Sequence, residues 1–505
     1  MPSPLHAPAR HSQSLSNATL SKLGAHVRVP SYDRTTITPA IVHIGVGGFH
    51  RAHQAVYLDE LAERGISTGW GVIGVTLRRR AMKDALEPQD GLFTVVERGD
   101  EQDVARVVGS IAAVLFAPEE PDAVLAALSD PRTRIVTLTI TGNGYHLDPT
   151  TGRLADDADV RADLAQPVRP RTAPGYVVES LDRRRRAGTP PFTVLSCDNV
   201  PDNGAAARAA VVGLAEARDP DLAAWIDAEV AFPRTVVDRI TPETSRGAYE
   251  LVVRSFGVDD RWPVVTESFS QWIVEDRFCN GRPPLDEVGV QFVDDVEPYE
   301  RMKKRLLNAS HSALGYVGYL LGHRDTAGAM TDALMRSYLD RLMEDEIAPL
   351  LPPVPGVDLD EYRATLLARF SNEKVGDQLE RLCGRGSTKM PAYLLPSIVE
   401  ARRQARPHEL LTLAVAAWVR YLRGVDLDGR EISIKDARLD ELQRMAIEGG
   451  NDPAPFMANS RVFGRLADDP MLVGSVARIL AALDRDGLRP TVEAFLRAEP
   501  GRLAA

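Results

Sequence analysis

Cysteine is scarce in this 505-residue sequence, which contains only Cys197, Cys279 and Cys383. A set that is small, odd in number and without a CxxC pair provides neither a disulfide framework nor a zinc-knuckle spacing. The scarcity therefore predicts a reducing, cytoplasmic setting.

Positive charge and long apolar runs are also scarce. The 60 lysines and arginines are outnumbered by 71 acidic residues, and the formal net charge of −11 argues against a binder of nucleic acids or anionic membranes. Two short basic runs, 78–80 and 183–186, are interpreted first as solvated helix faces. The longest apolar stretch, near 313–321, is too short to span a bilayer, and the first 40 residues lack the apolar core of a signal peptide. We expect a small-molecule substrate, no nucleic-acid or membrane partner, and a monomer or small homo-oligomer.

The first half of the chain has an α/β pattern. A short apolar run at 41–44 ends in glycines, an amphipathic stretch follows at 51–64, and a second apolar run lies at 72–75. This order predicts a strand, a helix and a parallel strand. Further strands of the same sheet or its extensions are predicted at 134–140, 192–196 and 264–266, and helices near 119–128 and 205–217.

From residue 298 onward, apolar residues recur mostly at helical spacing, and Pro283, Pro284 and Pro298 punctuate the chain just before the change. The chain is also too long for one simple core, so two domains are expected. Predicted helices are 299–321, 332–344, 360–370, 398–403, 408–422 and 473–486.

The glycines at the end of the first strand form a candidate dinucleotide site. Gly45-Val46-Gly47-Gly48 would permit a tight turn and a close approach of backbone N–H groups to a pyrophosphate at a helix N-terminus. His50 stands where G-x-G-x-x-G has its third glycine, so an ordinary strand-to-helix turn remains an alternative. The candidate cofactor residues here are Ile44, Gly45, Val46, Gly47, Gly48 and Phe49.

The second strand ends in Thr76-Leu77-Arg78-Arg79-Arg80, without the acidic residue that would bind the ribose hydroxyls of NAD. Arg78 could hold a 2′-phosphate, which would favour NADP, or could face water. NAD is the preferred cofactor and NADP stays open.

A lysine, an asparagine and a histidine lie close together at Lys303, Asn308 and His311. A lysine can serve as a base when its surroundings disfavour its charged form, and Asn and His can donate to a developing oxyanion. On an α-helical wheel these residues fall at about 0°, 140° and 80°, whereas Lys304 with Asn308 and His311 spans only about 60°. Angles therefore do not choose the lysine, and a surface lysine beside two ordinary polar residues remains an alternative.

Together these motifs resemble one family. The run 41–53 resembles the N-terminal signature of the polyol-specific long-chain dehydrogenases, the mannitol dehydrogenase family, and 302–312 resembles their catalytic helix. The segments 196–199, 237–242 and 275–283 also match, and the resemblance runs from about residue 20 to the C-terminus. It implies an α/β Rossmann-type dinucleotide-binding domain with extensions at 1–297, and a mainly α-helical substrate and catalytic domain at 298–505.

The resemblance also implies the residue roles. Lys303 becomes the general base, Asn308 and His311 the oxyanion-stabilising pair, and Glu300 the group that passes the proton to solvent. Substrate-binding positions are implied at Asn199, Asp238, Arg381 and Lys389. No metal is implied, although His43, His50 and His53 cluster near the glycines.

The implied activity is metal-independent hydride transfer between NAD(P) and a secondary alcohol of a polyol, with D-mannitol and D-fructose as the favoured pair. A fructuronate reductase acting on D-mannonate and a D-arabinitol dehydrogenase are alternatives, as is a non-catalytic nicotinamide-binding regulator. Arg381 favours the polyol. The chain departs from the family pattern in two places. The acidic pair that family members carry after the second strand is absent, and Gly142 stands where their Thr-Glu-Gly-Gly-Tyr segment has its glutamate.

Overall fold

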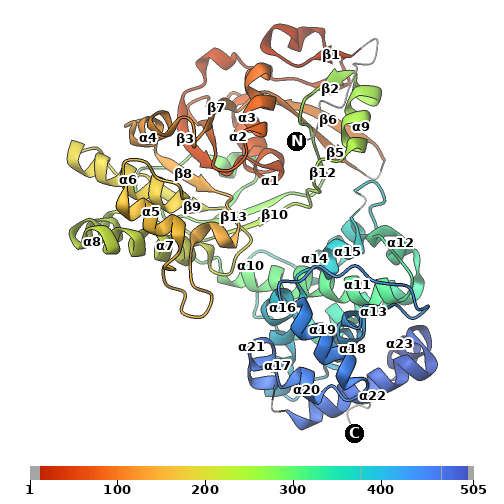
Figure 1. Cartoon of the computed structure of the whole chain (residues 1–505). Helices are drawn as coiled ribbons and strands as arrows, with labels where there is room; N and C mark the ends of the chain where they lie inside the picture. Colours follow the sequence, from red (N-terminus) through yellow and green to blue (C-terminus); the bar gives the residue numbers. More distant parts are fainter. Residues whose placement is uncertain (1–11, 100, 376, 468, 499–505) are drawn as a thin grey trace. The chain divides into compact units, whose positions relative to one another are not determined.

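The computed structural model describes residues 12–99, 101–375, 377–467 and 469–498, and the chain divides into two compact units, one up to Val296 and one from Glu297 (Figure 1). Among the described residues, no helix has both the length and the apolar character that crossing a membrane requires.

The main sheet of the first unit is fully parallel, with strand order β7-β4-β3-β8-β9. Its strands are β3 (Pro39–Ile44), β4 (Gly71–Thr76), β7 (Ile111–Phe116), β8 (Ile135–Leu138) and β9 (Thr193–Ser196). The helices of this unit are α1 (Gly48–Ala52), α2 (Gln54–Glu63), α3 (Ala81–Leu86), α4 (Pro121–Ser129), α5 (Ala158–Ala165), α6 (Ala173–Ala187), α7 (Asn203–Arg218), α8 (Pro220–Glu229) and α9 (Arg246–Phe256). The Rossmann-type fold expected from the sequence is confirmed.

Strand β3 is buried from Ala40 to Ile44, as expected for a parallel strand whose sheet is covered by helices on both faces. Val42 and Ile44 pack into a cluster with α4, α6 and α7. Ile41 points to the opposite face and packs with residues of α2, as the alternation of side chains along a strand requires.

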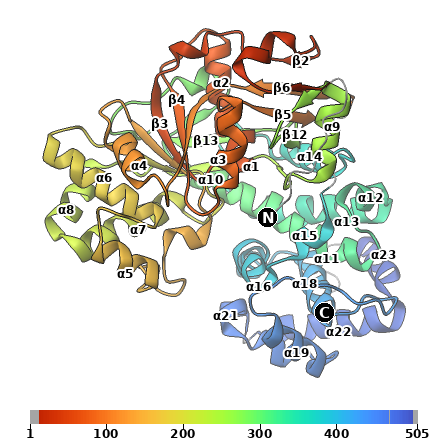
Figure 2. The ribbon, with the colours of Figure 1, turned by 45° about the horizontal axis from the view of Figure 1, so that its top comes forward.

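Three smaller sheets extend this unit. One has the order β12-β5-β6-β2 (Figure 2), a second has the order β10-β13-β14, and a third pairs β1 with β11. Their strands are β1 (Gln13–Ser14), β2 (Val27–Arg28), β5 (Phe93–Arg98), β6 (Asp103–Val108), β10 (Thr235–Asp238), β11 (Val258–Asp259), β12 (Val264–Glu267), β13 (Gln271–Glu275) and β14 (Gln291–Val293). The strand predicted at 264–266 is thus in an extension rather than in the main sheet, because β12 pairs with β5.

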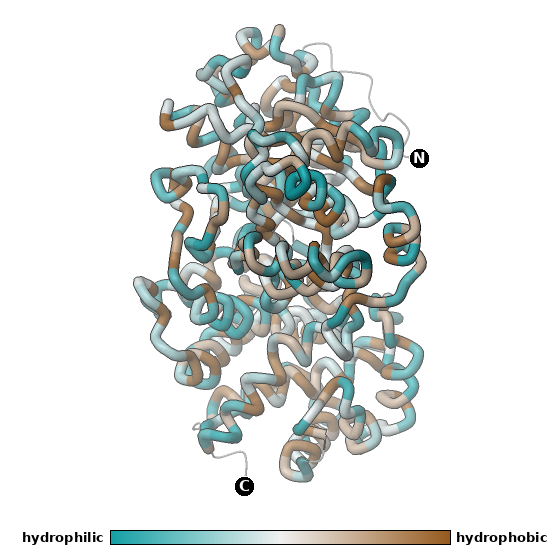
Figure 3. The backbone as a smooth tube through the Cα atoms, turned by 90° about the vertical axis from the view of Figure 1, so that its left-hand side faces the viewer, coloured by the Kyte–Doolittle hydropathy of each residue, from teal (hydrophilic) through white to brown (hydrophobic). Residues whose placement is uncertain are grey.

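The second unit is helical, as expected. Its helices are α10 (Glu297–Met302), α11 (Ala309–Leu320), α12 (Thr326–Thr331), α13 (Ala333–Arg341), α14 (Leu359–Phe370), α15 (Leu379–Cys383), α16 (Gly386–Lys389), α17 (Leu395–Arg403), α18 (Glu409–Leu422), α19 (Leu439–Gly449), α20 (Ala454–Met457), α21 (Ser460–Phe463), α22 (Pro470–Asp486) and α23 (Leu488–Arg497). Helix α18 is buried from Leu410 to Leu422 and contacts α11 and α22. Brown and teal alternate along many of the outer helices in Figure 3, which is the pattern of helices that bury one face.

Among the residues of the second unit that the structure describes, three segments are π-helical, namely Lys303–Asn308, Leu342–Ile347 and Met390–Leu394. A π-helical turn inserts one residue into an α-helix and is frequent at functional sites. The first segment, called here the π segment, joins α10 to α11 and contains two of the candidate catalytic residues.

The basic run 183–186 is not a fully solvated helix face. Arg184 is buried within α6 and donates hydrogen bonds to the carbonyl oxygens of Leu128, Asp130 and Pro190. The run 78–80 lies in the loop between β4 and α3 rather than on a helix.

Candidate functional site

The glycine turn joins β3 to α1 and is tied to the end of β4, because the Gly45 N–H donates to the Val75 carbonyl at 2.8 Å. Gly45 has a φ of +108°, and a Cβ atom there would lie 2.2 Å from the Thr139 carbonyl oxygen. The fold itself therefore requires glycine at this position.

Gly47 and Gly48 are different, because the fold leaves room at both. A Cβ atom at Gly47 would approach described protein atoms only to 3.6 Å, and one at Gly48 only to 3.7 Å. Packing within the chain therefore does not demand glycine at either position. Two bare backbone positions beside a helix start fit the close approach of a pyrophosphate.

His43 supports the turn through a hydrogen bond to Thr139. The Thr139 hydroxyl donates to the Gly45 carbonyl at 2.8 Å, so its oxygen must accept from His43 Nε2 at 2.9 Å. In the neutral imidazole, Nδ1 then accepts from the Thr137 hydroxyl at 2.8 Å. Burial lowers the pKa of His43 to about 3, and the ring stacks on His50 with centroids 3.4 Å apart. Both ring nitrogens of His43 are thus used within the fold.

The loop after β4 places its three arginines differently. Arg80 forms ion pairs with Asp84 and Glu119. Arg78 and Arg79 are exposed, and the Thr76 hydroxyl donates to the Arg79 carbonyl at 2.8 Å, which closes the loop into a tight turn.

A buried carboxylate lies at the ends of β8 and β9. Asp198 accepts hydrogen bonds from the Ile140 and Thr141 N–H groups at 2.9 and 2.8 Å, and from the Tyr145 hydroxyl at 2.7 Å. Burial raises the pKa of Asp198. Asp198 was not predicted as a site residue, although it lies two positions after the strand predicted at 192–196.

Asp198 anchors the loop that carries Asn199, a predicted substrate residue, and Asp238 is a second one on another element. Asn199 is the next residue and is exposed, whereas Asp238 ends β10 and is 5% exposed. The Asn203 side chain donates to the carbonyl oxygens of Asp198 and Thr235, which connects the loop after β9 to the start of β10. Asn199 therefore lies in a loop that is bonded to the first residue of β10, whereas Asp238 is the last residue of that strand.

The π segment changes the geometry of the candidate catalytic helix. The Ala309 N–H donates to the Lys304 carbonyl five residues earlier, whereas an α-helix would use the residue four earlier. Residues five apart lie about one π turn apart, so Lys303 and Asn308 share a face. The α-helical wheel was therefore wrong for this segment, and in the wider π turn Lys303 and Lys304 both lie near the face of Asn308. The two lysines differ in their surroundings, because Lys303 is buried whereas Lys304 forms an ion pair with Glu300.

Lys303 and Asn308 are 6% and 8% exposed. Within the described chain, the Asn308 Nδ2 atom is buried and has no hydrogen-bond partner. A buried amide donor without a partner is costly unless a ligand accepts its hydrogen. His311 follows one turn later on α11, and its ring packs against Phe370 with centroids 4.8 Å apart.

Arg381 on α15 and Lys389 on α16 lie in the same unit, and α15 packs against α11. The Lys389 ammonium donates to the carbonyl oxygens of Arg381 and Leu382 at 3.1 and 2.9 Å. Burial, with the nearby charges of Arg381 and Arg385, lowers the pKa of Lys389 to about 8. The Arg381 guanidinium forms a bidentate ion pair with the buried carboxylate of Asp377.

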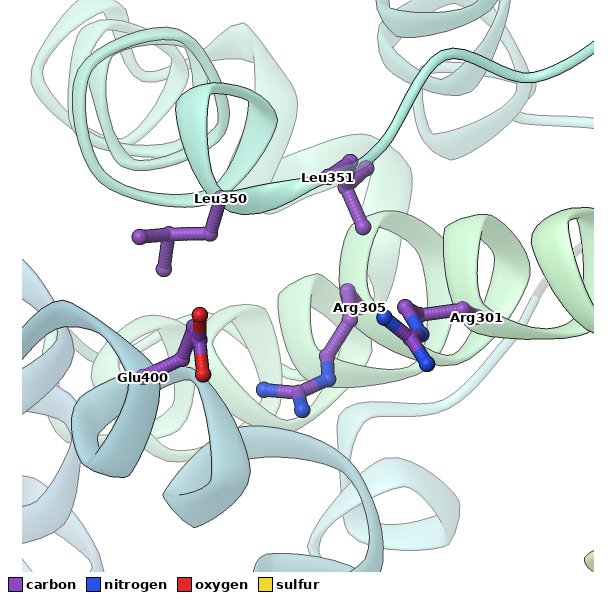
Figure 4. Close-up of a pocket in the computed structure, with 5 residues that line it drawn as sticks. All are labelled: Arg301, Arg305, Leu350, Leu351 and Glu400. Carbon is purple, nitrogen blue, oxygen red and sulfur yellow. The ribbon is translucent and has the colours of Figure 1, made fainter. Parts of the chain in front are cut away.

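A separate hollow is lined by Arg301, Arg305, Leu350, Leu351 and Glu400 (Figure 4). The Arg305 guanidinium donates to the Ser397 hydroxyl at 2.9 Å, and burial lowers its pKa to about 10. None of the predicted site residues lines this hollow.

Comparison with known proteins decides the family. Residues 39–287 match the description "Mannitol dehydrogenase Rossmann domain", and residues 295–484 match "Mannitol dehydrogenase C-terminal domain". The chain belongs to the mannitol dehydrogenase family.

Named members of the mannitol dehydrogenase family are similar over nearly the whole chain. The mannitol 2-dehydrogenase of Phaeosphaeria nodorum is 44% identical, covering 95% of this chain and 85% of its own. That of Aspergillus fumigatus is 43% identical, with coverage of 94% and 96%.

Two solved structures are also similar. The ternary complex of Pseudomonas fluorescens mannitol 2-dehydrogenase with NAD and D-mannitol has a TM-score of 0.87 at 42% identity, covering 96% of this chain and all of that one. A D-sorbitol dehydrogenase in substrate-free form has a TM-score of 0.88 at 36% identity, with coverage of 95% and 100%.

In this member of the family, the predicted site residues form two sets. The glycine turn, Arg78, Asn199 and Asp238 belong to the first unit, and the remaining candidates belong to the second. The family glutamate replaced by Gly142 falls in a turn of 3-10 helix directly after Thr141, whose φ is +64°.

Proposed function

We propose that the chain is an NAD-dependent polyol dehydrogenase that interconverts D-mannitol and D-fructose. Membership of the mannitol dehydrogenase family and the similarity to enzymes named mannitol 2-dehydrogenase support this activity. The observation that carries it is the π segment, which combines a buried lysine with a buried amide donor that lacks a partner within the described chain.

The residues of the first unit suit the cofactor. Gly45, Gly47 and Gly48 would hold the pyrophosphate, with Ile44, Val46 and Phe49 around the turn. NAD, when bound, accepts the hydride of the alcohol.

The proton is handled by this chain's own residues. The Lys303 amine takes the hydroxyl proton of the substrate. Asn308 Nδ2 and the His311 imidazole donate hydrogen bonds to the oxygen on which negative charge develops. Glu300, one turn before Lys303 and Lys304, passes the proton from Lys303 toward solvent.

The other substrate hydroxyls bind to Asn199, Asp238, Arg381 and Lys389. The charge of Arg381 is already balanced by Asp377, so this guanidinium is poorly available to a second carboxylate. That pairing favours a neutral polyol over a uronate such as fructuronate or D-mannonate.

D-Sorbitol is a second candidate substrate, because the D-sorbitol dehydrogenase structure matches with a TM-score of 0.88. Oxidation at C2 of D-sorbitol also yields D-fructose. The two hexitols differ in configuration at C2, so activity on each tests the stereochemical preference of the site.

The test is a nicotinamide absorbance assay of the purified protein with D-mannitol, D-sorbitol, D-arabinitol and D-mannonate. We expect turnover of D-mannitol and a kcat for Lys303→Ala lower by about 10²–10⁴, the usual contribution of a positioned base, with NADH binding retained. Lys304→Ala is the matched variant, and its kcat should fall far less. A larger loss in Lys304→Ala would contradict the assignment of the base, and no turnover with any polyol would favour a nicotinamide-binding regulator.

We also propose a cytoplasmic setting and a monomer or small homo-oligomer. All three cysteines are free thiols, and two of them, Cys197 and Cys383, are buried, as a reducing compartment allows. Cell fractionation and light scattering of the purified protein test these two points.

A further inference from the structure

The loop after β4 carries two arginines that the proposed reaction does not use. Arg78 and Arg79 are exposed, and neither side chain forms a hydrogen bond or an ion pair with any residue that the structure describes. Their charges are therefore available to a ligand.

The carboxylates near this loop are already paired. Arg80 forms ion pairs with Asp84 and Glu119. The Lys83 ammonium lies 2.6 Å from Glu120 and 3.4 Å from Glu87. These four carboxylates contact Arg80 and Lys83 rather than Arg78 or Arg79, so they do not occupy the guanidinium groups of Arg78 and Arg79.

The position of the two arginines is defined by hydrogen bonds. The Val75 carbonyl accepts from the Gly45 N–H, so the end of β4 is joined to the glycine turn. The Thr76 hydroxyl donates a hydrogen bond to the Arg79 carbonyl, which keeps the loop close to the carboxyl end of β4. In dinucleotide folds, the residue at the end of the second strand contacts the 2′ position of the adenosine ribose: an acid there binds the 2′-hydroxyl, and an arginine accommodates a 2′-phosphate.

We propose that Arg78 and Arg79 bind the 2′-phosphate of NADP, so that this enzyme accepts NADP as well as NAD. The inference rests on the proposed dehydrogenase function. Guanidinium groups form charge-assisted, often bidentate hydrogen bonds to phosphate oxygens. No acid in the loop 77–80 is present to repel the phosphate.

The test measures binding without turnover, by calorimetric titration of the full chain with 2′,5′-ADP and with 5′-ADP. We expect the wild type to bind 2′,5′-ADP more tightly. The double variant Arg78→Ala/Arg79→Ala should lose affinity for 2′,5′-ADP by about tenfold for each arginine, the size of one charge-assisted hydrogen bond. Its affinity for 5′-ADP should change by less than about twofold, because 5′-ADP lacks the 2′-phosphate.

The matched control is Arg132→Ala/Arg186→Ala. Both arginines are exposed and precede β8 and β9. They therefore lie near the amino-terminal ends of the parallel strands, whereas the glycine turn follows the carboxyl end of β3. This variant removes the same charge and should keep the preference for 2′,5′-ADP. Loss of the preference in the control would overturn the proposal, because net charge would then explain it.

The outcomes separate this inference from the function on which it rests. Oxidation of D-mannitol with NAD, together with equal affinities for 2′,5′-ADP and 5′-ADP, would overturn the inference and leave the dehydrogenase function standing. Failure to bind either nucleotide, with no polyol turnover, would overturn both.

Discussion

The buried imidazole of His43 makes a quantitative prediction about acid stability. In the folded protein its pKa is lowered by burial to about 3, whereas an unfolded histidine titrates near 6.5. Below pH 6.5 the unfolded chain therefore takes up a proton at this residue that the folded chain does not. Stability must fall as the pH drops from 6.5 toward 3.

The magnitude follows from linkage. Each pH unit between the two pKa values costs about 1.4 kcal/mol of unfolding free energy. Moving from pH 7.5 to pH 5 should therefore remove about 2 kcal/mol through His43 alone. Burial also lowers the pKa of His50 well below its usual value, so His50 should steepen the same trend.

Urea unfolding followed by circular dichroism at several pH values, for the wild type and His43→Gln, isolates this contribution. The glutamine cannot titrate, so the stability advantage of the wild type should shrink by about 2 kcal/mol between pH 7.5 and pH 5. An advantage that stays constant over this range would refute the argument, since the imidazole would then titrate alike in the folded and unfolded chains.

Three further predictions concern the sites. Gly45→Ala should lower the melting temperature and weaken NADH binding at least about tenfold, because the added Cβ would meet the Thr139 carbonyl at a φ of +108°; calorimetry and fluorescence titration measure both, and an unchanged variant would contradict the geometry. Asp198→Ala should cost about 3 kcal/mol or more of unfolding free energy, because two N–H groups and a phenol lose their acceptor; a loss below about 1 kcal/mol would argue against the network. The KM for D-mannitol should rise as the pH passes about 8, where Lys389 loses its proton and its charge. Steady-state kinetics should show no such rise in Lys389→Met, and a rise of equal size in that variant would assign the titration to another group.

Sequence periodicity was sufficient where one local pattern dictated the structure. The apolar run at 41–44 is strand β3, and the glycines that follow it form the turn that the fold requires at Gly45. The helical spacing from 298 onward also predicted the α-helical half correctly. Strands β5, β6 and β7 were not predicted. They follow one another without an intervening helix, and β5 and β6 contain charged residues, so they do not show the alternation of apolar runs and helices.

Other features depended on contacts between distant residues. Arg184, in a run expected to face water, is buried because three carbonyl groups from other segments accept its hydrogen bonds. Asp198 became recognisable as a structural anchor only when Ile140, Thr141 and Tyr145 were seen to donate to it.

The sequence by itself determined the two-part α/β and helical architecture and the residue types able to bind a dinucleotide and move a proton, because these follow from local periodicity and side-chain chemistry. Only the tertiary structure showed that Lys303 is buried while Lys304 pairs with Glu300, and that the helix between them and Asn308 is a π-helix. The single inserted residue of the π segment changes the rotation between positions five apart, and no periodicity in the sequence records that insertion.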